Sequence, residues 1–315
     1  MSEIAVIGAG AWGTALAIQA ARAGRAVVLW ARDPARAAAI EATRENPRLP
    51  GAHLPESIRI TADLPAAPIA LLAVPMLHLS ACLPDAGALI ACCKGLTGGR
   101  LPLELLAERR PGVPAGVLTG PNFAHEVAAG LPAAAVLAAT DPVLRAAAIA
   151  ALASPAFRLY GNDDPIGAQV GGAAKNVVAI AAGAVIGAGL GENARAALVT
   201  RGLAELARLA VALGGRAETV AGLSGLGDLL LTCTGPSSRN FSLGLALGQG
   251  QPLAAILAAR TSATEGVATA PALVARAAAA GVEMPVCAAV AAVVQGQLSV
   301  PEAMSRLLAR PQRDE

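Results

Sequence analysis

Short apolar runs alternate with helical patterns through the first half of the chain. Residues 4–7 are apolar and are followed by Gly8, which is typical of a buried parallel strand. Residues 12–23 then have helical spacing, and Gly24 stands where glycine often follows the end of a helix. Residues 26–30 are apolar again, so the chain opens with a strand–helix–strand unit.

The same alternation continues along the next part of the chain. Further strands are expected at 69–74, 89–91, 116–118 and 134–137, and helices at 102–109 and 142–152. Strands that alternate with helices in this way pair into a doubly wound parallel sheet. The first half of the chain is therefore predicted to have an α/β fold of the Rossmann type.

The pattern changes after Tyr160. A turn-rich segment, Gly161-Asn162-Asp163-Asp164-Pro165, is followed by long stretches rich in Ala, Leu and Gly. Helices are expected at 166–188, 194–213, 243–249, 269–280 and 286–294, and a solvated tail at 310–315. We predict a dinucleotide-binding domain over 1–160 and an all-helical substrate-binding and catalytic domain over 161–315.

Charge and cysteine content narrow the class of protein. The net charge is only +2 and basic residues are not interleaved with aromatic ones, so nucleic acid is not expected as a partner. The five cysteines include no C-x-x-C motif, and the three histidines have no zinc-site spacing. We expect no metal, no disulfide framework, and a reducing, cytoplasmic location.

The mean hydropathy of +0.57 raises the question of a membrane. The longest apolar run, residues 177–190, is shorter than the roughly 20 residues that a spanning helix needs. Glu3 stands where a signal peptide would carry positive charge. We expect no export signal and no stable membrane insertion, and the extensive apolar helices favour a homodimer.

A G-x-G-x-x-G motif lies directly between the first strand and the first helix. Gly8 permits the tight turn, Gly10 lets the backbone approach a pyrophosphate, and Gly13 lets the helix pack against the strand. The helix N-terminus adds free N–H groups and a positive dipole end. The motif therefore predicts a bound dinucleotide.

The end of the second strand bears on which dinucleotide is used. An acidic residue there binds the ribose 2′-hydroxyl of NAD, whereas a guanidinium can bind the 2′-phosphate of NADP. Arg32 occupies this region and is followed by Asp33, which could still serve NAD. The sequence thus indicates NADP or NAD, with NADPH favoured.

Two lysines are the main candidates for chemistry, because a hydride transfer to a ketone needs a proton donor near the carbonyl oxygen. Lys94 follows a predicted strand, where open α/β sheets bind ligands. Lys175 lies in an otherwise apolar helix, where partial burial would lower its pKa, and the preceding Gly171 and Gly172 would leave room for a ligand. His125, beside Glu126 on a predicted helix, is the weaker acid–base candidate.

Two polar segments complete the candidate site. Asp228 follows a Gly-Leu-Gly sequence and suits either a helix N-cap or a catalytic role, with Thr232 four residues later on the same face. Ser238, Arg239 and Asn240 combine a guanidinium with small hydrogen-bond donors, which suits a phosphate as well as a solvated loop.

In their order along the chain, these motifs resemble the bacterial NAD(P)-dependent glycerol-3-phosphate dehydrogenase family. The resemblance extends from the first strand to about Arg306. Beyond the glycine-rich start, it is carried by Val74-Pro75, Lys94-Gly95-Leu96, Gly120-Pro121-Asn122-Phe123-Ala124, Gly172-Ala173-Ala174-Lys175-Asn176-Val177, Gly225-Leu226-Gly227-Asp228-Leu229 and Ser238-Arg239-Asn240.

The resemblance implies reduction of dihydroxyacetone phosphate to sn-glycerol 3-phosphate, the backbone of phospholipids. Lys175 would be the proton donor and acceptor, with Lys94 and Asp228 helping to hold and polarise the substrate. The implied substrate site also includes Gly120, Asn122, Asn176, Thr232, Ser238, Arg239 and Asn240. The implied cofactor site adds Ala11, Trp12, Ala124 and Glu265 to the glycines, Arg32, Lys94 and Arg239.

Some positions depart from the family pattern. The segment from Ile58 to Pro75 looks shortened, so the third helix and strand are expected to be trimmed. Asn122 stands where the family commonly has Ser or Thr, and Thr97 where it usually has an acidic or aliphatic residue.

Two alternative functions remain open on the residues alone. One is a related dehydrogenase acting on a hydroxy acid or ketopantoate, and the other is a non-enzymatic NAD(P)-sensing module.

Overall fold

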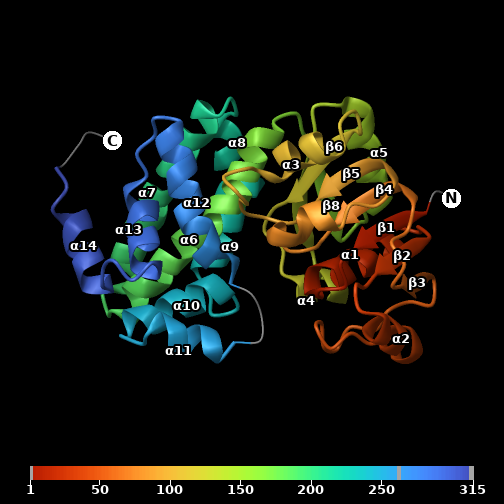
Figure 1. Ribbon diagram of the computed structural model, residues 1–315, viewed down its shortest axis with the longest axis horizontal. Helices are drawn as coiled ribbons and strands as arrows, with labels where there is room; N and C mark the ends of the chain where they lie inside the picture. Colours follow the sequence, from red (N-terminus) through yellow and green to blue (C-terminus); the bar gives the residue numbers. More distant parts are fainter. Residues whose placement is uncertain (1–2, 261–263, 312–315) are drawn as a thin grey trace. The chain divides into compact units, whose positions relative to one another are not determined.

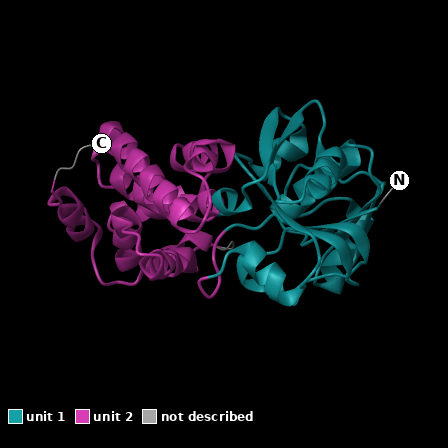
Figure 2. Ribbon diagram, turned by 90° about the horizontal axis from the view of Figure 1, so that it is seen from above, with its two compact units in different colours: residues 1–94, 100–169 teal, residues 95–99, 170–315 magenta. Residues whose placement is uncertain are grey.

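The computed structural model describes residues 3–260 and 264–311. They form two compact units, one of residues up to 94 with 100–169 and one of residues 95–99 with those from 170 onward (Figure 2). The predicted boundary after residue 160, between two domains that would each fold on their own, stays a prediction. Of the expected tail, residues 312–315 lie outside the described residues.

The first unit is built on one eight-stranded sheet (Figure 1). The strand order is β3-β2-β1-β4-β5-β6-β7-β8, and all neighbours are parallel except β6 and β7. The strands are β1 Ile4–Ile7, β2 Val27–Trp30, β3 Ile58–Thr61, β4 Ala67–Leu72, β5 Ala86–Ala91, β6 Ala115–Thr119, β7 Ala133–Ala138 and β8 Phe157–Asn162. The doubly wound fold is therefore confirmed, with one antiparallel pair that the sequence did not predict.

Helices cover both faces of this sheet. They are α1 Ala11–Arg22, α2 Pro34–Thr43, the 3-10 helix η1 Met76–Ala81, α3 Pro102–Arg109, α4 Ala124–Ala129 and α5 Pro142–Leu152. Alternate strand residues enter separate apolar clusters: Val6 and Leu29 belong to one, Ile7 and Trp30 to the other. Each fully buried side chain of this kind contributes roughly 1.5–3 kcal/mol, so the sheet forms a stable base for the loops at its edge.

Some elements of this unit were not predicted, because their apolar patterns in the sequence are weak. Strand β3 is short and only half-buried, with Arg59 exposed between Ile58 and Ile60. Strand β8, at the sheet edge, carries exposed residues including Tyr160. Helix α2 begins at Pro34 behind a capping Asp33 and was not expected. Between β3 and β4, residues 62–66 contain bends and no helix, as the shortened segment indicated.

The described part of the second unit is all helical, as predicted. Its elements are α6 Pro165–Gly187, of which residues 165–169 are assigned to the first unit, α7 Gly191–Ala212, α8 Ala217–Ala221, the π-helix η2 Leu223–Gly227, α9 Asp228–Cys233, α10 Arg239–Gly248, α11 Leu253–Ala258, α12 Glu265–Ala279, α13 Pro285–Val294 and α14 Val300–Leu308. Helix α10 starts four residues before the predicted 243, because Ser238 caps it. Helix α12 begins at Glu265, before the predicted 269, and continues through Pro271.

Helix α6 is the central helix of this unit. Among the described residues it is the one helix long and apolar enough to cross a membrane, yet 83% of its most apolar stretch is buried inside the protein. Such burial is typical of the core helix of a folded domain, so its apolar character reflects protein packing.

Glycines bring α6 and α10 into direct backbone contact. A Cβ on Gly244 of α10 would lie 1.9 Å from the carbonyl oxygen of Ile180, and one on Gly183 of α6 would lie 2.0 Å from that of Phe241. Neither position has room for a side chain, since real Cβ atoms do not approach backbone atoms so closely. The start of α10, with Arg239 and Asn240, is therefore fixed against the helix that carries Lys175.

Candidate active site

The turn between β1 and α1 uses its three glycines in three different ways. Gly8 has a φ of +114°, and a Cβ there would lie 3.0 Å from the backbone of Ala73. A Cβ on Gly13 would lie 1.9 Å from the carbonyl oxygen of Gly8. By contrast, apart from the adjacent chain itself, no atom of the described residues lies within 4 Å of the Cβ position of Gly10. The first and third glycines thus serve the packing of the chain, and the second faces open space.

The N-terminus of α1 adjoins this open space. Gly10 is the N-cap residue and has no side chain that could accept hydrogen bonds from the first-turn N–H groups. Ala11 and Trp12 follow it and are half-buried. Unobstructed N–H groups at a helix N-terminus bind phosphate anions. The turn therefore fits the pyrophosphate of NAD(P).

Residues that the sequence analysis missed hold this turn in place. Asn46 is buried, and its Nδ2 donates to the carbonyl of Ala9 at 3.1 Å and to Oγ1 of Thr14 at 2.7 Å. The Ala9 carbonyl also accepts from Nη2 of Arg36. Asn46 lies 37 residues beyond Ala9 in the sequence, so no local pattern could have paired them.

The candidate cofactor-selecting residues follow β2. Arg32 is exposed, shortly after the strand ends at Trp30. The carboxylate of Asp33 accepts from the backbone N–H of Ala35 at 3.0 Å and caps α2. Asp33 thus has a structural task, which leaves Arg32 as the more available of the two for a cofactor.

Lys94, Gly120 and Asn122 lie together at the ends of β5 and β6. Lys94 Nζ donates to the carbonyl of Gly120 at 3.2 Å. Asn122 donates from Nδ2 to the carbonyl of Ala134 at 3.2 Å, while its buried Oδ1 has no partner among the described residues. A buried acceptor without a partner suits a donor from a ligand. Ala124, half-buried, begins α4 just beyond.

In the second unit, Lys175 and Asp228 form a buried ion pair. The Lys175 ammonium on α6 donates to Oδ1 of Asp228, at the start of α9. Lys175 is 9% exposed and Asp228 is fully buried. Two charges taken out of water in this way must be paired, because an isolated buried charge costs several kcal/mol. The interpretation of Asp228 as an N-cap is wrong, because Gly227 occupies the N-cap position and Asp228 is the first residue of α9.

A glycine contact positions Asp228 and corrects one expectation. A Cβ on Gly171 would lie 2.6 Å from the carbonyl oxygen of Ser224 and 2.9 Å from Cα of Gly225. The space beside Gly171 is therefore filled by the backbone of η2, and the expectation that it is open to a ligand is wrong. Because η2 leads directly into α9, this close approach places Asp228 against α6.

The remaining polar residues of this region have well-defined partners. Thr232 Oγ1 donates to the backbone carbonyl of Asp228 at 2.6 Å. Ser238 is buried, and its Oγ accepts from the N–H of Phe241 at 3.2 Å, so it caps α10. Arg239 is the first residue of α10 and is exposed. The segment expected to be a loop is thus a helix start with its guanidinium in solvent.

Asn240 links three helices. Its Nδ2 donates to Oδ1 of Asn176 at 2.9 Å, and its Oδ1 accepts from the N–H of Gly266 at 3.2 Å. Asn176 follows Lys175 on α6, and Gly266 follows Glu265 at the start of α12. The structure therefore joins two of the predicted residues directly, Asn176 and Asn240, and Lys175 and Glu265 are the chain neighbours of residues in this network.

Other titratable groups play no evident part in the site. Burial raises the pKa of the Cys233 thiol to about 12, so it stays protonated and unreactive. The His125 side chain is 64% exposed and stacks on Phe123 with ring centroids 5.7 Å apart. No group of three or more His, Cys, Asp or Glu side chains that could bind a metal occurs within residues 3–260 and 264–311.

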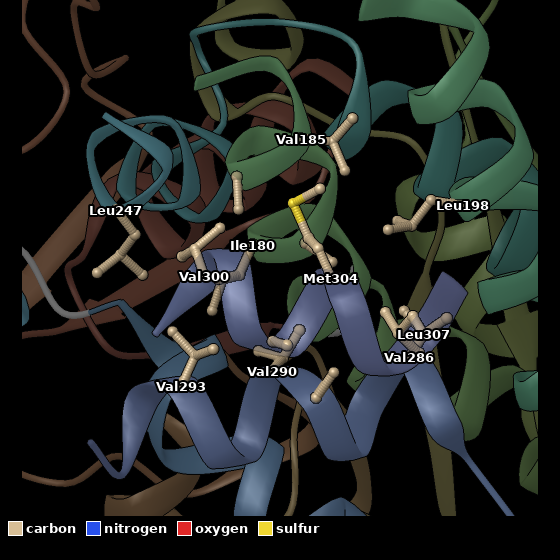
Figure 3. Close-up of a pocket in the computed structure, with 14 residues that line it drawn as sticks. Ile180, Val185, Leu198, Leu247, Val286, Val290, Val293, Val300, Met304 and Leu307 are labelled. Carbon is tan, nitrogen blue, oxygen red and sulfur yellow. The ribbon is translucent and has the colours of Figure 1, made fainter. Parts of the chain in front are cut away.

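The second unit also contains an apolar cavity (Figure 3). It lies among α6, α7, α10, α13 and α14, and its lining includes Ile180, Val290, Met304 and Leu307. None of the predicted site residues lines it. A cavity without polar groups offers nothing to bind a phosphate or to move a proton, so we attribute it to core packing.

Fold and chemistry together define a class of protein. A Rossmann-type sheet with an open glycine-rich turn binds a dinucleotide, and a helical unit with a buried lysine–carboxylate pair offers a proton donor. These are the parts of a nicotinamide-dependent dehydrogenase with a helical second domain.

Comparisons with known proteins narrow the class to one family. Residues 3–144 match the family described as NAD-dependent glycerol-3-phosphate dehydrogenase N-terminus, and residues 164–305 match its C-terminus. The chain is 59% identical to a glycerol-3-phosphate dehydrogenase [NAD(P)+] of Acidiphilium cryptum, over 99% of this chain and 98% of the relative. The chain belongs to the NAD-dependent glycerol-3-phosphate dehydrogenase family.

Solved structures agree with this assignment. The crystal structure of glycerol-3-phosphate dehydrogenase from Coxiella burnetii has a TM-score of 0.93 and 38% identity, covering 98% of this chain and 99% of that one. A ketopantoate reductase from Ralstonia eutropha JMP134 matches at a TM-score of 0.58 and 18% identity, over 96% of this chain and 99% of that one. The second likeness shows a shared fold alone, so the ketopantoate alternative is not supported.

Proposed function

We propose that the chain reversibly reduces dihydroxyacetone phosphate to sn-glycerol 3-phosphate with NAD(P)H, in the cytoplasm, and so supplies glycerol phosphate for phospholipid synthesis. The observation that carries the proposal is the buried Lys175–Asp228 pair on a helix fixed to the start of α10. A proton donor and a guanidinium that suits a phosphate are what a small keto-phosphate requires.

The cofactor is expected at the glycine-rich turn. Gly8, Gly10 and Gly13, with the first-turn residues Ala11 and Trp12, would hold its pyrophosphate. Arg32 would bind at the adenosine end and favour NADPH. The proposed site also includes Lys94, Ala124, Arg239 and Glu265. Bound NADPH or NADH supplies the hydride, and all other chemistry falls to the side chains of the protein.

Lys175 is proposed to move the proton. In the direction of reduction, its ammonium gives a proton to the substrate oxygen that gains negative charge, and in the reverse direction its amine removes that proton. Asp228 holds the ammonium in one orientation through their hydrogen bond. Thr232 steadies the first turn of α9 through its bond to the Asp228 carbonyl.

The substrate phosphate is proposed to bind at the start of α10. Arg239 is exposed and extends a guanidinium that can make two parallel hydrogen bonds to phosphate oxygens. The Ser238 hydroxyl can donate while its oxygen accepts the capping bond. The proposed substrate site is completed by Lys94, Gly120, Asn122, Asn176 and Asn240.

The state of assembly is part of the same proposal. The apolar surface of the helical unit includes Val211 and Leu308, which are 55% and 83% exposed. We expect two copies of the chain to associate as a homodimer, with no nucleic acid and no membrane as partner. Sedimentation of the purified protein would test the dimer.

Kinetic assays of three proteins test the reaction. Wild type, Lys175→Ala and Lys175→Arg are compared in the oxidation of NADPH with dihydroxyacetone phosphate. Both variants should lose about 10²–10⁴-fold in kcat, because arginine keeps the charge but does not give up its proton. An inert wild type would refute the activity, and an active Lys175→Arg would refute the role of Lys175.

A further inference from the structure

The side chain of Arg36 joins the glycine-rich turn to the region after β2. Its Nη2 donates to the carbonyl of Ala9 and, at 3.1 Å, to Oδ1 of Asn46. Ala9 lies inside the turn, and Arg36 lies in the first half of α2. The guanidinium therefore occupies the stretch between the pyrophosphate site and the end of β2, where a Rossmann fold receives the adenosine ribose.

Most of this guanidinium is not used by the protein. A guanidinium has five N–H donors, and the two bonds of Nη2 leave three, on Nη1 and Nε, for which residues 3–260 and 264–311 provide no acceptor. Arg36 is also only half-buried. A side chain held at one end with three donors free is prepared to bind an anion.

The surroundings of Arg36 are positively charged. Burial lowers the pKa of Arg36, the charge of Arg48 lowers it further, and Asp33 raises it. The Asp33 carboxylate already accepts the capping bond from Ala35 and lies in an exposed position. Two guanidiniums close enough to repel each other are stabilised by an anion placed between them.

Arg32 follows the end of β2 and is exposed. Burial raises the pKa of Cys82, and the charge of Arg32 partly offsets this rise, so the two residues are near each other. Cys82 belongs to the apolar cluster on the Trp30 face, whereas Ala9 belongs to the opposite cluster. Arg32 and Arg36 both lie in the short stretch of chain that follows β2.

We propose that Arg36 selects the cofactor: it binds the turn through Nη2 and offers Nη1 and Nε to the 2′-phosphate of NADPH, together with Arg32. The inference rests on the proposed cofactor site at the glycine-rich turn. NADH has a hydroxyl at this position, so it gains little from the free donors. Arg36 therefore acts as a positioning residue for the turn and as a specificity residue for the phosphate.

The two tasks of Arg36 can be separated experimentally. In Arg36→Gln, the amide can still donate to the Ala9 carbonyl, but the charge and the free donors are lost. Asn46→Ala removes the other bond to that carbonyl and leaves Arg36 its charge, so it is the matched control. A purely structural role of Arg36 predicts equal effects on all ligands, as in the control.

The test is direct binding to the full chain by isothermal titration calorimetry, with 2′,5′-ADP, 5′-AMP, NADPH and NADH. Arg36→Gln should raise the Kd of 2′,5′-ADP and NADPH by at least about tenfold, the loss of one charge-assisted hydrogen bond, and change that of 5′-AMP and NADH by less than about threefold. Asn46→Ala should weaken NADPH and NADH by one common factor.

Equal weakening of NADPH and NADH by Arg36→Gln would overturn the proposal, and so would unchanged binding of 2′,5′-ADP. Binding is measured without dihydroxyacetone phosphate, so a failure of the proposed reaction would be seen separately. Melting curves followed by circular dichroism identify any variant that fails to fold. In that event Arg36→Lys, which keeps the charge with fewer donors, takes its place: it should bind 2′,5′-ADP more weakly than wild type with little change for 5′-AMP, and equal changes for both would overturn the proposal.

Discussion

Lys175 and Asp228 are 53 positions apart in the sequence and are joined by a hydrogen bond inside the second unit. One comes from the middle of α6 and the other from the start of α9. The π-helix η2 lies against Gly171 and sets this approach, because no Cβ fits at that position. The ion pair therefore depends on backbone packing as well as on the two charges.

Asp228→Asn is expected to lower both stability and activity. The substitution keeps the shape but leaves the Lys175 ammonium buried without a counter-charge, which costs about 3–5 kcal/mol in comparable pairs. Urea unfolding should show that loss of free energy of unfolding, and kcat should fall by at least about 10²-fold. The double variant Lys175→Met/Asp228→Leu provides the control: it should regain most of the stability and none of the activity. Recovered activity would mean that neither group transfers the proton.

Gly10→Ala and Gly13→Ala should separate cofactor binding from folding. A Cβ at position 10 would enter open space, so the stability of Gly10→Ala should stay within about 0.5 kcal/mol of wild type while NADPH binding weakens. A Cβ at position 13 would lie 1.9 Å from the Gly8 carbonyl oxygen, and a loss of about 2–5 kcal/mol is expected. Thermal unfolding and calorimetric titration with NADPH measure the two effects. Undiminished binding by the Gly10→Ala protein would remove the turn from the cofactor site.

Gly171→Ala is expected to impair catalysis without touching a titratable group. The added methyl would meet the Ser224 carbonyl at 2.6 Å and push η2 away from α6, and Asp228 with it. We expect kcat to fall by about tenfold or more, because even a small misplacement of a catalytic group slows the reaction. The Kd of NADPH should stay unchanged. A variant that loses NADPH affinity and keeps kcat would contradict this interpretation of the contact.

Glu205 should make stability depend on pH. Its carboxylate is buried on α7 and accepts from the N–H groups of Val286 at 2.6 Å and Cys287 at 3.1 Å, at the start of α13. Burial raises its pKa above the ordinary 4.5, and the two backbone hydrogen bonds oppose the rise. A pKa that is higher in the folded state means that folding favours the protonated form.

The contribution of Glu205 to stability is therefore full below about pH 4.5 and is lost as the pH rises through the raised pKa. Glu205→Gln cannot titrate, so the difference in free energy of unfolding between wild type and variant should change in that window and be constant well above it. Urea titrations at a series of pH values would measure it. A difference that does not vary with pH would show that burial does not perturb Glu205.

The elements near the cofactor turn could be predicted from the sequence because their signals are local. The apolar run before Gly8 and the helical spacing after Gly13 fix a strand, a turn and a helix within a short stretch. Lys175 was identifiable because a charge inside an apolar helix is rare. Its partner was less certain, since Asp228 fits an N-cap equally well until the packing of η2 is known.

The features that were missed depend on contacts between distant residues. Asn46 and Arg36 brace Ala9 through hydrogen bonds that no periodicity encodes. The antiparallel pairing of β6 with β7 follows from how the chain returns to the sheet, and not from the apolar pattern of either strand. Ser238 was interpreted as a phosphate ligand or as part of a solvated loop, and its role as the cap of α10, which moves the helix start to Arg239, was not expected.

The glycine contacts between α6 and α10 bear on how such an enzyme could acquire a new substrate. The two helices are held together by main chains in contact at Gly183 and Gly244 and, next to Lys175, by the hydrogen bond between Asn240 and Asn176. Ketose phosphates with a longer carbon skeleton would need the separation between the two helices to grow. If the proposed substrate site is correct, engineering for them would have to redesign the contact between the two helices.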